Sequence, residues 1–270
     1  FPVSSRLGSN GNSNGVQTKF QIAATAGKAD IILNLPKMKT HQLMFYTGAM
    51  KNLFGLIQGL TKGTYHFRYP DRTNFARMIV NLNASMPEVY TIMDGITAME
   101  GPGPGSGYPR QVGLIFSSSN VLALDFVVSS IMGYDPLVLP VSSLALKTGL
   151  WLSVPEEITV SGEDPSKLVM ADYKRIKDPG DTGFIKNLMP VKLYKLLQKA
   201  LIPRPVFSKK RCIRCGECIA ICPAKALKFS GNKPNRYVDI DYKVCINCYC
   251  CHEICPADAI TIRRKFLPWL

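Results

Sequence analysis

The chain has 270 residues, of which 46% are hydrophobic, and this length suits two globular domains. With 33 basic and 19 acidic residues it carries a formal net charge of +14. It contains no uninterrupted apolar run near the roughly 18 residues that a membrane span requires, and no signal segment at its start. We therefore expect a cytoplasmic protein without a membrane span. Because the sequence begins at Phe1 and not at methionine, we also expect a processed chain or a fragment.

The first 165 residues predict an α/β layered domain. Residues 1–19 are rich in Gly, Ser and Asn and predict a loop or an ordered arm. Strands alternate with helices, which is typical of a largely parallel sheet. The expected strands are 29–36, 88–93, 112–116 and 157–160, and the expected helices lie within 42–60 and at 76–84, 121–132 and 141–149.

Polar residues follow the first and second of these strands. Lys37, Lys39 and His41 come directly after Pro36, and Asp94 ends the next strand. In open parallel sheets ligands bind at the carboxyl ends of the strands. We therefore predict a site for a small anionic substrate, in which His41, Lys39 and Asp94 are the candidate catalytic residues. Four further residues are the candidate substrate-binding groups: Lys37, Lys51, Asn52 and Ser118. The alternative is that they are ordinary surface groups.

Two other features of this domain have competing interpretations. Residues 101–107 alternate glycine with proline, but they lack the Lys-Ser/Thr of a phosphate loop, so a shaped lid or a substrate-facing turn is expected. Asp125 interrupts an apolar helix. It is either a buried hydrogen-bond partner or a charge that favours the helix dipole.

Residues 166–205 predict a basic connector. Pro190 can open a helix whose leucines form an apolar stripe, with lysines on the other side, and this stripe is expected to pack on one of the domains. Basic residues are dense from Lys174 to Arg211. They favour an acidic redox partner or an anionic substrate, although a solvated surface would look the same. Nucleic acid is disfavoured because no recognition motif accompanies the charge.

Residues 206–270 contain all nine cysteines of the chain, and eight of them form two equal runs. The first is Cys212-x2-Cys215-x2-Cys218-x3-Cys222-Pro223, and the second is Cys245-x2-Cys248-x2-Cys251-x3-Cys255-Pro256. This spacing is typical of bacterial domains with two 4Fe-4S clusters, in which the fourth cysteine of each run binds the other cluster. Applied here, one cluster is held by Cys212, Cys215, Cys218 and Cys255, and the other by Cys245, Cys248, Cys251 and Cys222.

An internal repeat supports this assignment. Aligning Cys212 with Cys245 also aligns residues 223–227 with 256–260, so a loop, a short helix and a strand are duplicated. Zinc is the alternative metal, but the third cysteine of each run and the Cys-Pro endings disfavour it. Cys250 lies outside the pattern and is expected to be a free thiol near the cluster loop.

The sequence also resembles two known families. Residues 206–270 resemble the bacterial dicluster ferredoxins at all eight ligand positions. Lys37-Met38-Lys39-Thr40-His41 and Lys51-Asn52-Leu53-Phe54-Gly55 resemble domain of unknown function family 362, over about residues 25–165. Members of that family are often fused to a ferredoxin domain and normally have a further segment before this one. The resemblance therefore implies a partial chain, and it implies no reaction.

Two functions are consistent with these patterns. In the first, the clusters pass electrons to or from chemistry on a small anion at the α/β domain, which would make the protein an oxidoreductase. In the second, the protein is a non-catalytic electron carrier or binding module that docks a redox partner. Structural clusters in a nucleic-acid protein are a third, disfavoured alternative.

Overall fold

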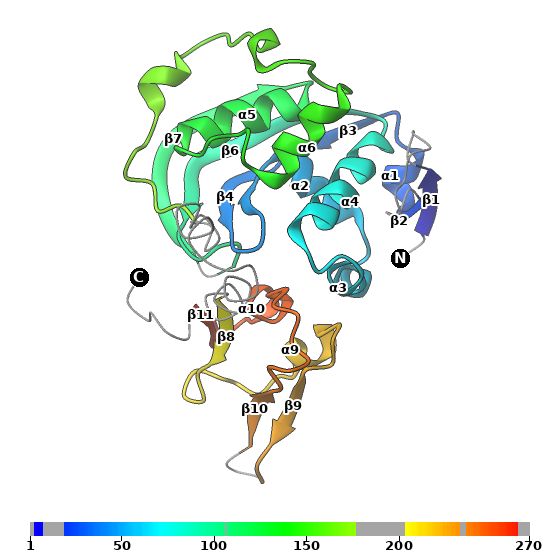
Figure 1. Ribbon diagram of the computed structural model, residues 1–270, viewed down its shortest axis with the longest axis vertical. Helices are drawn as coiled ribbons and strands as arrows, with labels where there is room; N and C mark the ends of the chain where they lie inside the picture. Colours follow the sequence, from blue (N-terminus) through cyan, green and yellow to red (C-terminus); the bar gives the residue numbers. More distant parts are fainter. Residues whose placement is uncertain (1–2, 8–18, 106, 177–202, 233–235, 264–270) are drawn as a thin grey trace, which may run out of the picture. The chain divides into compact units, whose positions relative to one another are not determined.

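The computed structural model describes residues 3–7, 19–105, 107–176, 203–232 and 236–263. The chain divides into two compact units, residues 1–175 and 176–270 (Figure 1). We refer to them as the first unit and the second unit.

The first unit is built on a mixed five-stranded sheet of β3 (Ile31–Asn34), β4 (Lys37–His41), β5 (Phe45–Thr47), β6 (Glu88–Glu100) and β7 (Tyr108–Ser118). β3 and β4 both pair with β6 in parallel. β5 pairs with β4, and β7 with β6, in antiparallel orientation. The predicted α/β class is therefore confirmed, with the parallel pairings in the middle of the sheet and antiparallel strands beside them.

Helices cover one face of this sheet, and Figure 1 shows α5 lying over β6 and β7. The helical segments are α2 (Ala49–Asn52), η1 (Leu53–Leu56), α3 (Gly59–Arg68), α4 (Arg72–Ala84), α5 (Val121–Ile131) and α6 (Pro140–Thr148). α4 begins at Asp71, whose carboxylate accepts from the N–H of Asn74, and α5 begins at Asn120, whose side chain accepts from Leu122 and Ala123. These are the usual N-cap bonds, and they fix where each helix starts.

The core of the first unit lies between the sheet and these helices. Met38 and Met93 of the sheet are fully buried, as are Phe75, Ile79 and Leu122 of α4 and α5. Each such side chain contributes about 1.5–3 kcal/mol by leaving water. The helices are thereby fixed on the sheet that carries the predicted polar residues.

The segment after Pro36 is itself a strand, whereas the sequence predicted polar groups gathered at the carboxyl end of the preceding strand. The N–H of Asp94 donates to the carbonyl of Pro36 at 2.9 Å, so the pairing with β6 continues past the proline. Met38 and Thr40 alternate into the core. Asp94 accordingly lies within β6, which runs to Glu100, and does not end a strand.

Other expected elements differ in extent. The helix expected within 42–60 is divided among β5, α2, η1 and the start of α3. The strand expected at 157–160 is not formed. Pro155 opens a short 3-10 helix, η2 (Pro155–Glu157), and the residues that follow it do not pair with any strand in the described part of the chain. Within the expected N-terminal arm, β1 (Val3–Leu7) pairs with β2 (Lys19–Ala23), and residues 8–18 lie outside the described residues. α1 (Ala24–Lys28) and η3 (Pro165–Leu168) complete the first unit.

Residues 166–175 group with the first unit, although the sequence analysis assigned them to the connector. The hydroxyl of Tyr173 donates to the carbonyl of Met99 at 2.8 Å, and Tyr173 is buried. The amphipathic helix expected to begin at Pro190 lies outside the described residues.

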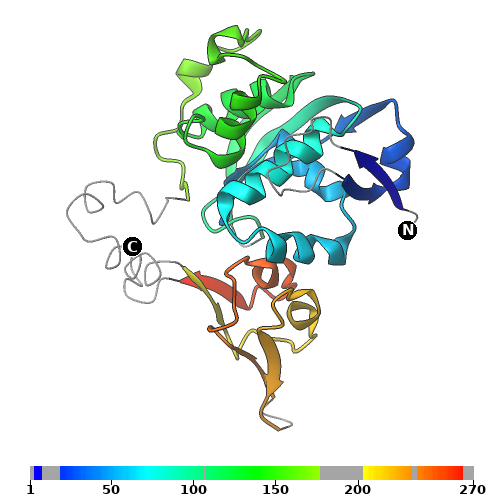
Figure 2. The same cartoon turned by 45° about the vertical axis from the view of Figure 1, so that its right-hand side comes forward.

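The second unit contains the same three elements twice. The first copy is β8 (Arg204–Phe207), α9 (Glu217–Ile221) and β9 (Leu227–Ser230), and the second is β10 (Tyr237–Ile240), α10 (Cys250–Ile254) and β11 (Ile260–Arg263). Each element recurs 33 residues later, as Arg204 and Tyr237 show. β8 pairs with β11 and β9 with β10, so both pairings join a strand of the first copy to a strand of the second (Figure 2). In the ranges that the structure covers, no helix has the length and apolarity needed to cross a bilayer.

Candidate metal centre

The cysteines of the two runs occupy equivalent positions in the two copies. In each copy two cysteines precede the helix, a third lies within it, and a fourth follows it directly as the C-cap. Cys218 and Cys251 are the buried members within α9 and α10, and Cys222 and Cys255 are the caps. The duplication predicted from the sequence is therefore a structural repeat.

Left-handed backbone positions turn the chain between successive cysteines. Arg214 has φ 62° and its equivalent Asn247 has φ 53°. Gly216 has φ 87°, and in the second copy Tyr249 occupies this position with φ 63°. Non-glycine residues seldom adopt such angles, and they persist where the surrounding structure imposes them. The same strained turn at the same place in both copies indicates that the loop shape is required.

Backbone amides also point at the fourth cysteine of each run. The N–H of Ala226 donates to Sγ of Cys222, and the N–H of Ala259 donates to Sγ of Cys255, both at 3.3 Å. The residue before each alanine, Lys225 or Asp258, is again left-handed. The two amides therefore face the sulfurs that the cysteine spacing predicts as the fourth ligands of the clusters.

Electrostatic contacts show which sulfurs lie together. Burial, followed by the charges of Cys212, Cys215 and Cys255, raises the pKa of the Cys218 thiol to about 11. Such mutual effects act only between nearby thiols. Cys255 belongs to the second run, so the structure brings the fourth cysteine of one run beside the first three of the other.

The second set shows the same crossing. Burial raises the pKa of Cys251, with further contributions from Cys248, Cys245, Cys218 and Cys222. Burial also raises the pKa of Cys245, to which Cys222 contributes. Soft sulfur donors gathered in this way, with amides directed at Cys222 and Cys255, fit iron–sulfur clusters, although within the described residues no three of them are placed to hold a single metal ion.

Cys250 is buried at the first position of α10, where the first copy has Glu217. A hydrogen bond with the side chain of Cys248 is the largest cause that raises the pKa of Cys250, and burial adds to it. The thiol form of Cys250 is therefore favoured beside Cys248.

In the first unit, the structure brings two of the predicted site residues together. Nζ of Lys37 lies 2.6 Å from Oδ2 of Asp94 and donates to the carbonyl of Thr97 at 2.9 Å. The hydrogen bond from Lys37 holds the pKa of Asp94 below its usual value, and the N–H of Ile96 acts in the same direction. The pair is about half exposed, so its charges are screened by water.

His41 is not assembled with this pair. Its side chain is 1% exposed, and its Nδ1 accepts from the N–H groups of Leu43 and Met44 at 3.1 and 3.2 Å. His41 lies four residues beyond Lys37 along β4, which corresponds to about 13 Å of strand. Lys39 lies between them, half-buried, and pairs with Thr47 and Met99 in the ladder.

The other predicted binding residues lie elsewhere on the sheet. Nδ2 of Asn52 donates to Oδ1 of Asn34 at 2.8 Å, and Lys51 precedes it in α2. Ser118 pairs with Thr91, and its hydroxyl accepts from the N–H of Asn120. The sequence predicts Ser118 at the same sheet edge as Asp94, because each residue follows an expected strand. That placement is wrong, because β7 is antiparallel to β6 and ends beside the start of β6.

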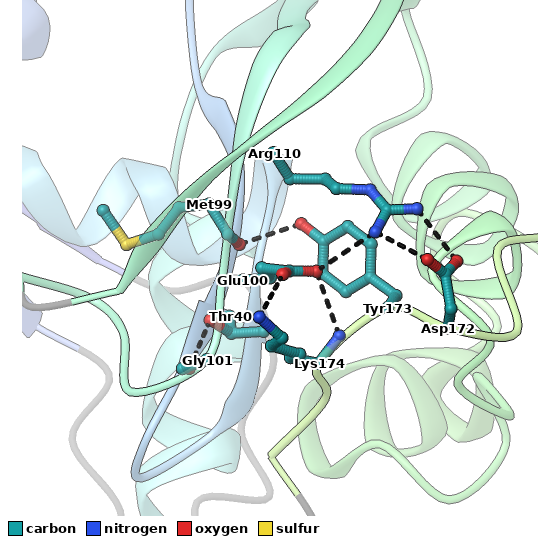
Figure 3. Close-up of polar contacts among 8 residues, drawn as sticks. All are labelled: Thr40, Met99, Glu100, Gly101, Arg110, Asp172, Tyr173 and Lys174. Atoms are coloured by element: carbon teal, nitrogen blue, oxygen red, sulfur yellow. Dashed lines mark hydrogen bonds and ion pairs between the residues drawn. The ribbon is translucent and has the colours of Figure 1, made fainter.

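Sequence reasoning missed one polar cluster, shown in Figure 3. The carboxylate of Glu100, buried at the end of β6, accepts from the N–H of Lys174 at 3.1 Å and lies 3.4 Å from its ammonium group. Arg110 lies 3.8 Å from Glu100 and makes two hydrogen bonds of 2.8 Å to Asp172. Nothing in the local sequence links residues 172–174 to these strands. The residue spacing alone therefore gave no signal.

Comparisons with known proteins agree with this division of the chain. Residues 9–130 match the family described as Domain of unknown function (DUF362), and residues 211–259 match the 4Fe-4S dicluster domain. A thylakoid-associated protein of Synechocystis sp. is 36% identical over 156 residues, which are 57% of this chain and 48% of that protein. The chain thus spans about half the length of this curated relative. No solved structure matches the chain.

Proposed function

We propose that this chain, in which a DUF362 region is followed by a 4Fe-4S dicluster domain, is an electron carrier with two 4Fe-4S clusters in its second unit. The observation that carries the proposal is that cysteines of both runs lie together. Cys222 lines one pocket with Cys245, Cys248 and Cys251, and Cys212 and Cys255 pack against the buried cluster that contains Cys218. Iron–sulfur clusters exchange single electrons, so a carrier of this kind needs only a redox partner.

The proposed ligand sets follow the crossing. One consists of Cys212, Cys215, Cys218 and Cys255, and the other of Cys245, Cys248, Cys251 and Cys222. Ala226 and Ala259 then donate to cluster-bound sulfurs, and the left-handed residues Arg214 and Asn247 turn the chain just before Cys215 and Cys248.

A reductive titration tests this function. Anaerobically purified protein is titrated with dithionite while its visible absorbance and paramagnetic resonance are followed. We expect uptake of about two electrons per chain, one for each cluster. A chain that contains zinc and takes up no electrons would contradict the proposal.

A second candidate function, chemistry on a small anion in the first unit, is favoured by the Lys37–Asp94 pair. Lys37 presents an exposed ammonium group, which a substrate carboxylate or phosphate can bind in place of Asp94. In this candidate Lys39 and Lys51 add positive charge, and the proton of His41 is carried on its Nε2, because Nδ1 accepts from two backbone amides.

Calorimetry with inorganic phosphate and with succinate distinguishes the two candidates. Binding that Lys37→Met abolishes and Asp94→Asn strengthens supports an anion site. If neither phosphate nor succinate binds to the wild-type protein, the anion site is rejected and the electron-carrier function remains.

The partner of the carrier is proposed to be an acidic redox protein, because the chain is strongly basic. The proposed compartment is the cytoplasm, where thiols stay reduced for cluster assembly. The description of the relative as thylakoid-associated suggests the thylakoid as a second possible location to test. Fractionation of cells that produce the protein, followed by immunodetection, assigns it to one of them.

A further inference from the structure

The repeat in the second unit provides an internal comparison between two loops of the same shape. Residues 208–217 form the first cysteine loop, and residues 241–250 form the second cysteine loop. Each contains the first two cysteines of its run and ends on the first residue of its helix. Their left-handed residues coincide, with Arg214 matching Asn247 and Gly216 matching Tyr249. The backbone turns at the same positions in both loops, so the two loops are compared residue by residue.

The two loops differ strongly in charge. The first cysteine loop carries Lys209, Lys210, Arg211 and Arg214 against the single acid Glu217, a net formal charge of +3. At the equivalent positions the second cysteine loop has Tyr242, Lys243, Val244, Asn247 and Cys250. Its only charged residues, Asp241 and Lys243, cancel. One copy of the repeat has thus acquired a basic surface that the other lacks.

The loops also differ in exposure. Ile213 is 64% exposed, and Cys215 beside it is exposed, whereas Ile246 and Cys248 are half-buried. An exposed apolar side chain surrounded by charged ones is the arrangement of a protein interface, with an apolar centre and a polar rim. Because Cys215 is a proposed cluster ligand, this surface lies directly over a proposed redox centre.

Three of the four cations are held in place by contacts within the second unit. Nε of Arg214 donates to the carbonyl of Arg236 at 2.8 Å. Nζ of Lys209 lies 3.6 Å from the ring centre of Tyr237, and Arg211 lies 3.5 Å from Asp258. Side chains that are already ordered lose less entropy when a partner binds. The basic surface is therefore prepared for an anionic partner.

We propose that the first cysteine loop is the docking surface for an acidic redox partner, and that electrons enter and leave the chain there and not at the second cysteine loop. This inference rests on the proposed electron-carrier function. The partner would place carboxylates around Ile213, against Lys209, Lys210, Arg211 and Arg214. Attraction at long range would also raise the rate of encounter.

Two inorganic oxidants of opposite charge test the proposal on the intact, cluster-loaded chain. Protein reduced with dithionite and freed of excess reductant is mixed with ferricyanide, an anion, or with hexaamminecobalt(III), a cation. In each case one electron leaves the protein and reduces the metal complex, from Fe(III) to Fe(II) or from Co(III) to Co(II). The rates are measured by stopped flow at low and at high ionic strength.

The test variant combines Lys209→Gln, Lys210→Gln and Arg214→Gln. We expect its oxidation by ferricyanide to slow about 10-fold at low salt, within the range of electrostatic steering, and the difference to shrink at high salt. Oxidation by hexaamminecobalt(III) should stay equal or become faster. Equal slowing with both oxidants, or no slowing with ferricyanide, would overturn the proposal.

A matched control removes the same charge from other exposed positions of the second unit. It combines Lys225→Gln, Lys228→Gln and Lys243→Gln, of which Lys243 is the counterpart of Lys210 in the second cysteine loop. We expect ferricyanide rates within about 2-fold of the wild type. If the control slows as much as the test variant, net charge and not the loop governs the rate, and the docking surface is rejected.

A binding measurement separates this inference from the proposed function, because it needs no redox activity. A fluorescent oligoglutamate peptide is titrated with each protein, and anisotropy reports binding. The test variant should bind the peptide about 10-fold more weakly than the control variant does, and equal affinities would refute the docking surface even in protein that has clusters.

Chains without iron and sulfide would refute the proposed electron-carrier function instead. If an RNA oligonucleotide loses affinity in the test variant while peptide binding and ferricyanide rates do not change, the loop belongs to nucleic acid and the proposal fails.

Discussion

At the scale of single residues, Asp125 connects three elements of the first unit. Its carboxylate accepts from the N–H groups of Ala49 and Met50 at 2.6 and 3.0 Å and from the hydroxyl of Tyr46 at 3.0 Å. It thereby caps α2 from a position on α5. Of the two roles that the sequence allowed for Asp125, the buried hydrogen-bond partner is confirmed.

The burial of Asp125 makes part of the stability depend on pH. Burial raises its pKa to about 6, although its three hydrogen bonds act in the other direction. The unfolded chain loses this proton near pH 4 and the folded chain near pH 6, so the folded protein binds more protons between these values. The contribution of Asp125 to stability is therefore greatest below pH 4 and falls by up to about 3 kcal/mol as pH rises to 6.

The variant Asp125→Asn tests this dependence. The asparagine oxygen retains one acceptor, but its amide group faces backbone donors, so we expect a loss of about 1–3 kcal/mol in unfolding free energy at pH 7. The loss should grow toward pH 4, as measured by urea unfolding at several pH values. A difference that stays constant from pH 4 to 7 would show that Asp125 does not titrate in this range.

Gly48 allows the Asp125 carboxylate to approach. A Cβ atom on Gly48 would lie 1.9 Å from the Tyr46 hydroxyl and 2.1 Å from Oδ1 of Asp125. We expect Gly48→Ala to lower the unfolding free energy by at least about 2 kcal/mol, because the bond network must move apart. Gly55→Ala is the control, since a Cβ there meets nothing within 4 Å. Equal denaturation midpoints for the two variants would contradict the crowding at Gly48.

At the scale of elements, the end of β6 holds residues 172–174 against the sheet. Glu100 contacts Lys174 and Arg110, and the N–H of Gly101 donates to the carbonyl of Lys174 at 2.8 Å. Tyr173 adds its bond to Met99 (Figure 3). Residues 172–174 are therefore part of the first unit and not of a free connector.

Removing the charge of Glu100 should loosen this segment. In Glu100→Gln, Lys174 and Arg110 lose their buried counter-ion, and we expect a decrease of about 1–3 kcal/mol in unfolding free energy. Hydrogen exchange at the amide of Gly101 should become faster. Asp172→Asn, at the exposed end of the same cluster, should change little by comparison. Unchanged exchange at Gly101 in Glu100→Gln would remove Glu100 from this role.

The crossed cysteines give a prediction for the second unit. Cys222→Ala should damage the cluster held mainly by the second run, because Cys222 lies beside Cys245 and Cys251. Cys250→Ala should leave both clusters in place. Paramagnetic resonance of the reduced variants distinguishes them, and loss of a cluster from Cys250→Ala but not from Cys222→Ala would mean that the ligand register is wrong.

At the scale of the whole molecule, features formed by neighbouring residues were predicted better than features formed by pairing between distant segments. The cysteine spacing predicted the duplication, since loop, helix and strand are contiguous in the sequence. α5 and β7 were also predicted near their observed positions. The predicted anion site in the first unit depended on strand directions, which neighbouring residues do not determine.

The antiparallel course of β7 and the extension of pairing past Pro36 separate Ser118 and His41 from Asp94. The contact between Glu100 and Lys174 spans 74 residues and has no local signature. Basic charge was predicted as a feature of residues 174–211 in general. Its concentration on one of two equivalent loops follows from the alignment of Cys212 with Cys245, position by position.

The central claim, two iron–sulfur clusters held by crossed cysteines, is tested most directly by the iron and acid-labile sulfide content of the anaerobically purified chain. The account predicts about eight iron and about eight sulfide per chain, as two 4Fe-4S clusters require. One zinc per cysteine run without sulfide, or only about four iron per fully occupied chain, would contradict it.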